Sequence, residues 1–134
     1  MNVTFGNGKE NKCYEEFVNN PFDRTALRRF CKFYSKDIAD EALNRHNLLC
    51  RFATAAQYNA VYGSTDNRIE KMQGVKDKDP FILKVRVTGS YRKFFHVISD
   101  VENEELLKTR DWIGQFNEVT DIFVLEVNKH NYNI

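Results

Sequence analysis

Apolar and polar residues alternate along two runs within residues 80–98. In the first run every second residue is apolar: Leu83, Val85 and Val87. Alternation with a period of two is typical of a β-strand that buries one face. A short link that contains glycine, residues 88–90, joins this run to the second one. The pattern predicts a β-hairpin whose strands cover residues 81–88 and 91–98 and whose apolar face lies on a core.

Three basic residues fall on the opposite face of this hairpin: Lys84, Arg86 and Arg92. We call them the hairpin cations. Like charges on one surface repel one another, so their grouping indicates an anionic partner. The alternative is that they are solvated charges on an exposed face, which is where charged residues usually lie.

Upstream of the hairpin the pattern changes to helical spacing. Residues 2–5 predict a first strand at the edge of a sheet, and residues 9–19 predict a short helix. Asn20 suits a helix cap and Pro21 suits a first helical position. Two antiparallel helices are predicted between Pro21 and Tyr62, the second of which ends at Gly63. His46 stands among polar neighbours in that second helix, which predicts a surface position.

Downstream of the hairpin, residues 122–127 are almost continuously apolar. Such a run predicts a central strand, over residues 122–129, that is covered on both faces. Glu126 interrupts it, and a buried carboxylate needs a partner, for which Arg86 or Arg92 is the candidate. Together these elements predict an α+β fold in one domain over residues 1–134.

Composition limits the classes of protein to consider. No run approaches the ~20 apolar residues of a membrane span, and the N-terminus lacks a signal-peptide core. We therefore expect a cytoplasmic protein with no membrane partner. Three scattered cysteines predict neither a disulfide framework nor a zinc site: Cys13, Cys31 and Cys50. The net charge is only +1, but residues 71–98 hold seven basic and two acidic residues, so the hairpin is locally basic.

The run KVRVTGSYR, from Lys84 to Arg92, resembles the central hairpin of the RelE/ParE toxin superfamily. Residues 121–132 resemble the last strand of that family and its basic and aromatic tail, and residues 69–81 resemble its link from helix to sheet. The resemblance implies a RelE-like α+β fold, in which a helical hairpin packs on a small antiparallel sheet. Residues 101–120 form a longer link than the family has, either a lid beside the site or a cover for a sheet edge.

The resemblance also implies a function. RelE-like proteins are toxins of type II toxin–antitoxin systems, and they inhibit translation as ribosome-dependent mRNA endonucleases. This cleavage is a metal-free transesterification, so no cofactor is expected. The implied partners are a cognate antitoxin and mRNA in the ribosomal A site, with DNA contacted only through the antitoxin.

Individual roles follow from the same resemblance. Arg92 matches the arginine that holds the scissile phosphate, and Lys84 matches a basic position of the first hairpin strand. His130 stands where a proton carrier is expected, and Tyr132 where a tyrosine stacks on a base or assists proton transfer. RNA or phosphate contacts are expected from three further cations: Arg86, Lys93 and Lys129.

Two other functions remain open at this point. One is a ParE-like, non-catalytic inhibitor of DNA gyrase, which the modest net charge favours. It is also favoured by Ile82, which stands where one branch of the nucleases has a lysine. The other is a relative without toxicity. His130 and Tyr132 beside the hairpin favour the nuclease.

Overall fold

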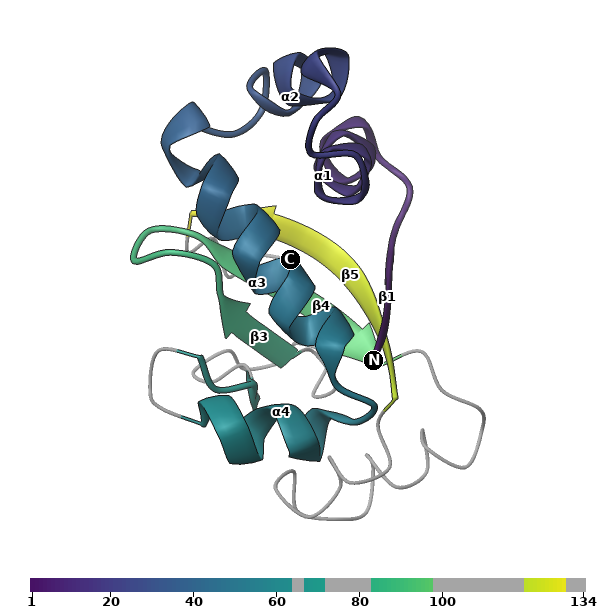
Figure 1. Cartoon of the computed structure of the whole chain (residues 1–134), viewed down its shortest axis with the longest axis vertical. Coiled ribbons are helices and arrows are strands. Elements are labelled where there is room, and N and C mark those ends of the chain that lie inside the picture. The colour runs from purple at the N-terminus through teal and green to yellow at the C-terminus, as the bar shows by residue number, and fades with distance from the viewer. Residues whose placement is uncertain (64–66, 72–82, 98–119, 130–134) are drawn as a thin grey trace, which may run out of the picture.

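The structure is a computed structural model that describes residues 1–63, 67–71, 83–97 and 120–129, with only the backbone at residues 71 and 93–97. Strands and helices both occur, so the predicted α+β class is confirmed (Figure 1). In chain order the elements are β1 (Asn2–Phe5), α1 (Lys9–Asn19), α2 (Arg24–Phe30), the 3₁₀ helix η1 (Lys36–Ile38), α3 (Ala39–Arg51), α4 (Ala55–Tyr62), β2 (Glu70–Lys71), β3 (Leu83–Arg86), β4 (Arg92–Val97) and β5 (Asp121–Asn128).

The strands form one sheet in the order β1-β5-β4-β3-β2. β2, β3, β4 and β5 pair antiparallel with their neighbours, whereas β1 pairs parallel to β5. The prediction of an antiparallel sheet is therefore wrong for this one pair. Parallel strands cannot be joined by a tight turn, and here the helices and the hairpin all lie between the two strands in sequence. The prediction that residues 2–5 form an edge strand is confirmed.

β5 contains a bulge at Leu125. Phe94 of β4 pairs with Glu126, and the next residue, Phe95, pairs with Val124, so Leu125 is the extra residue. The bulge shifts the alternation by one residue, and the buried positions are consequently Ile122, Val124 and Val127. This explains why Glu126 is not buried although it follows Val124 by two residues. β5 lies between β1 and β4, as predicted for a central strand.

The helices bury a cluster of aromatic side chains beside the sheet. α3 lies across one face of the sheet, and α1 and α2 lie together at one end (Figure 1). Tyr14 of α1 contacts the rings of Phe30 and Tyr34, with centroid separations of 5.6 and 5.3 Å. The predicted helix over residues 9–19 is confirmed, and its apolar residues are buried: Tyr14, Phe17 and Val18. Among the helices that the structure describes, none combines the length and the apolar character that a bilayer crossing requires.

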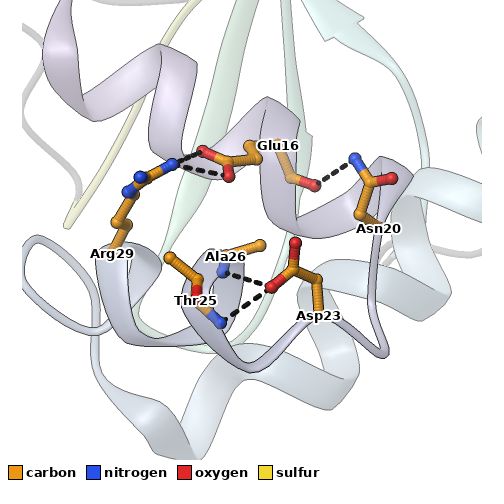
Figure 2. Close-up of polar contacts among 6 residues, drawn as sticks. All are labelled: Glu16, Asn20, Asp23, Thr25, Ala26 and Arg29. Carbon is orange, nitrogen blue, oxygen red and sulfur yellow. Dashed lines mark hydrogen bonds and ion pairs between the residues drawn. The ribbon is translucent and has the colours of Figure 1, made fainter.

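The segment between Pro21 and Tyr62 holds three α-helices and a 3₁₀ helix, so the prediction of two helices is wrong. Asn20 ends α1, and Asp23 caps α2, where its carboxylate accepts from the backbone N–H groups of Thr25 and Ala26 (Figure 2). Pro21 therefore lies in the turn between the two helices. Arg29 of α2 donates to Glu16 of α1 at 2.8 Å, which ties the helices together.

His46 is buried, with 4% of its surface exposed, so the predicted surface position is wrong. Its ring lies 6.1 Å from the ring of Phe5, measured between centroids. The residues on either side of His46 are polar because they lie on other faces of α3. β1 brings Phe5 against the face that holds His46, and this contact depends on the sheet topology rather than on the local sequence.

Candidate functional site

The hairpin cations occupy neighbouring positions on one face of β3 and β4. Arg86 and Arg92 are direct cross-strand partners, and Arg92 pairs on its other side with Asn128 of β5. Lys84 precedes Arg86 by two residues, so it lies on the same face. The residues that alternate with Lys84 and Arg86 along the chain are buried on the opposite face: Leu83, Val85 and Val87. This register confirms the predicted hairpin and the placement of its three cations.

Two carboxylates occupy the adjacent row of the same sheet. Glu70 of β2 pairs with Lys84, which in turn pairs with Phe94, and Phe94 pairs with Glu126. Glu126 is of intermediate exposure, so the predicted buried carboxylate is wrong, and with it the need for an arginine partner. Glu70 is also of intermediate exposure. Among the described residues, these two neighbouring rows therefore place two carboxylates beside the three cations, which makes this part of the sheet less positive than the sequence predicted.

Arg92 is held against the turn of its own hairpin. Its Nη1 atom donates to the backbone carbonyls of Thr88 at 2.6 Å, Tyr91 at 3.0 Å and Gly89 at 3.4 Å. The hydroxyl of Thr88 accepts from the N–H groups of Ser90 and Tyr91, each at 3.2 Å. The guanidinium thus closes the turn and is fixed in place by it. Arg92 therefore contributes to the local fold of the hairpin as well as to the candidate site.

Lys129 lies at the same end of the sheet, directly after β5. Its ammonium is 5.4 Å from the centroid of the Tyr91 ring, a cation–π arrangement. Tyr91 is buried and its ring lies 6.3 Å from that of Tyr34. Lys129 is exposed. The structure therefore places Lys129 beside the turn that Arg92 closes.

The remaining predicted site residues separate into two groups. Lys93 pairs with Val85 of β3 and with Val127 of β5. It directly follows Arg92 in β4, so its position belongs to the opposite face of the sheet from Arg86 and Arg92. His130, Tyr132 and Ile82 lie outside the described residues, as do residues 101–119 of the predicted insertion. Their roles stay predictions.

Sequence reasoning missed two features of this surface. Glu70 belongs to a segment that the sequence analysis had singled out, but its place beside Lys84 depends on the pairing of β2 with β3. The Arg92 contacts had a local signal, because an arginine directly after a glycine-containing turn can reach the turn carbonyls. In the part of the chain that the structure describes, no three His, Cys, Asp or Glu side chains gather as a metal site would need.

Comparison with protein-family models, with curated proteins and with solved structures finds no match for this chain. The resemblance to the RelE/ParE superfamily therefore rests on the residues quoted above.

Proposed function

We propose that this chain is a RelE-like toxin that cleaves mRNA on the ribosome, with Arg86 and Arg92 as its phosphate-binding pair. The observation that carries the proposal is the direct pairing of these two arginines across β3 and β4. Side chains at such positions start from Cβ atoms about 4.5–5.5 Å apart, and like charges there destabilise a sheet. A phosphate that binds between two guanidinium groups removes this repulsion.

The fixed position of Arg92 suits this role. Its Nη1 atom is engaged with the turn, so the guanidinium is oriented before any ligand arrives. A guanidinium donates from several N–H groups at once, and these match phosphate oxygens in a fork geometry. Donors that are already in place stabilise a charged transition state without further reorganisation. Cleavage by transesterification also needs a base and an acid, for which His130 and Tyr132 stay the candidates.

Arg86 offers the sharper test, because the loss of Arg92 would also remove contacts of the turn. Arg86→Ala should lower cleavage by on the order of a hundredfold, the usual effect of losing one transition-state contact. Arg92→Lys should impair cleavage as well, since lysine offers a point charge without the fork. The measurement is growth after induced expression, with primer-extension mapping of transcripts and a thermal melt of each purified variant.

Arg28 provides the matched control, because it is an exposed arginine on α2, away from the hairpin. Arg28→Ala should cleave as the parent does. If folded Arg86→Ala also cleaves as the parent does, the proposed phosphate pair is wrong. If the parent leaves transcripts intact and cells grow normally, the chain is a relative without toxicity.

A ParE-like inhibitor of DNA gyrase is the second candidate. It is favoured by Glu70 and Glu126, which lie in the row next to the arginines and weaken a purely phosphate-binding surface. A face of mixed charge suits a protein partner, whose own charges can complement both signs. Purified chain should then block gyrase supercoiling and leave translation in vitro unaffected, whereas the nuclease gives the reverse result.

A cognate antitoxin is part of the proposal in either case. The hairpin cations offer a charged surface that an acidic segment can cover, and disordered segments fold on such surfaces. Co-expression with the neighbouring gene product should restore growth and give a complex that purifies intact. Lys84→Glu together with Arg86→Glu should weaken that complex, and an unchanged complex would place the antitoxin elsewhere.

A further inference from the structure

α3 carries a histidine and a cysteine one turn apart that the proposed function does not use. His46 Nε2 lies 3.5 Å from Cys50 Sγ, within hydrogen-bond distance for sulfur. Residues separated by four positions share one face of a helix, so the helix itself sets this pairing. His46 is buried and its ring packs near Phe5, whereas Cys50 is exposed. A buried imidazole therefore lies against the thiol of a residue that is exposed on the surface of α3.

We propose that Cys50 is a thiol-exchange site that reacts with small disulfides, with the His46 imidazole as the acceptor of its proton. The thiolate is the reacting form of cysteine, so a base that takes the S–H proton promotes attack. The Cys50 sulfur attacks one sulfur of the disulfide, a new S–S bond forms, and the old S–S bond breaks. The departing thiolate takes up the proton that His46 had accepted. The chain gains a mixed disulfide, and one small thiol is released.

Two local effects act in opposite directions on this thiol. Cys50 is the next-to-last residue of α3, and the negative end of a helix disfavours a thiolate by about two- to fivefold. A hydrogen bond from a protonated imidazole to a thiolate favours it by about tenfold or more. The hydrogen bond is thus larger than the effect of the helix end, and burial of the His46 ring, which disfavours an imidazolium, reduces the gain that remains.

The chain supplies its own reference thiols. None of the three cysteines that the structure describes is in a disulfide. Cys31 and Cys50 are both exposed, and Cys13 is half-buried. The full chain is incubated with oxidised glutathione under native conditions, and mixed disulfides are mapped by peptide mass spectrometry over time. Cys50 should react about fivefold or more faster than Cys31. Equal rates, or a slower Cys50, would overturn the proposal.

Two variants separate chemistry from packing. His46→Gln should bring the rate ratio of Cys50 to Cys31 close to one in the folded chain. Ala42→Gly loosens the same helix at a buried position one turn earlier and keeps the imidazole, so it should lower the melting temperature but leave the ratio unchanged. A ratio that falls equally in both variants would show that packing alone controls Cys50, and the role of His46 would be wrong.

Discussion

At the scale of single residues, Asn11 shows how one amide fixes an irregular strand. Asn11 is buried in the first turns of α1, and its Nδ2 atom donates to the carbonyl of Leu125 at 2.6 Å. Leu125 is the extra residue of the β5 bulge, whose backbone loses part of its ladder pairing. The amide thus gives the Leu125 carbonyl a hydrogen-bond donor at the bulge, and it joins α1 to the central strand.

Asn11→Ala should lower the free energy of unfolding by about 1–2 kcal/mol, because a carbonyl in a part-buried site loses its donor. The better helix propensity of alanine offsets about 0.5 kcal/mol of the gross loss. Asn20→Ala is the matched control, since the Asn20 amide donates to the carbonyl of Glu16 in an exposed site. Its effect should stay within about 0.5 kcal/mol. Urea denaturation of both variants measures the difference, and equal losses would contradict the role of Asn11.

At the scale of elements, the corner between α1 and α2 contains two kinds of polar contact that contribute differently to stability (Figure 2). Asp23 satisfies two backbone N–H groups at the start of α2, which the helix cannot pair internally. Arg29 and Glu16 form an ion pair between side chains that are 52% and 32% exposed. Water screens such a pair, so it contributes little to stability.

Asp23→Ala should therefore lower the free energy of unfolding by about 1 kcal/mol, the usual cost of a lost N-cap. Arg29→Ala should lower it by less than about 0.5 kcal/mol at physiological salt. Thermal melts at low and high salt test the assignment, because the small Arg29 effect should vanish at high salt whereas the Asp23 effect should persist. A larger loss from Arg29→Ala would make the ion pair, and not the cap, the main link at this corner.

The helix boundaries show which local signals sequence analysis can use. The spacing of apolar residues predicted α1 correctly, because Tyr14, Phe17 and Val18 all lie on its buried face. The break before α4 was missed although its signal is local: Thr54 and Gln57 form a capping box, with the Thr54 hydroxyl 3.2 Å from the Gln57 N–H. The bulge in β5 left a weaker trace, the charged residue Glu126 at a position where simple alternation would place a buried one.

At the scale of the whole molecule, the features that sequence analysis missed are those that join distant segments. Local alternation predicted the hairpin and the common face of Lys84, Arg86 and Arg92, because period-two spacing fixes which side each residue takes. The parallel pairing of β1 with β5 joins residues 2–5 to residues 121–124, and no local pattern specifies it. The burial of His46 by Phe5 and the position of Glu70 beside Lys84 depend on such pairings. The sequence thus predicted the cations of the candidate site, but not the carboxylates that lie beside them.

The aromatic core makes the stability of the whole chain depend on alkaline pH. Burial raises the pKa of Tyr14, Tyr34 and Tyr58 above the usual value near 10, because a phenolate is poorly solvated inside the protein. In the unfolded chain these tyrosines ionise near pH 10. Below that pH their contribution is fully present. Above it the unfolded state has lost protons that the folded state keeps, so stability falls as pH rises towards the folded pKa values.

We therefore expect the free energy of unfolding to fall above about pH 10, by about 1.4 kcal/mol per pH unit for each such tyrosine. Tyr34→Phe should reduce the slope of this decline by the contribution of one tyrosine, about 1.4 kcal/mol per pH unit. Among the described residues the Tyr34 hydroxyl has no hydrogen-bond partner, so its removal should not destabilise the protein at neutral pH. Urea denaturation between pH 7 and 11 measures the slope, and phenolate absorbance follows ionisation. Ionisation of all the tyrosines near pH 10 in a folded chain of constant stability would contradict this expectation.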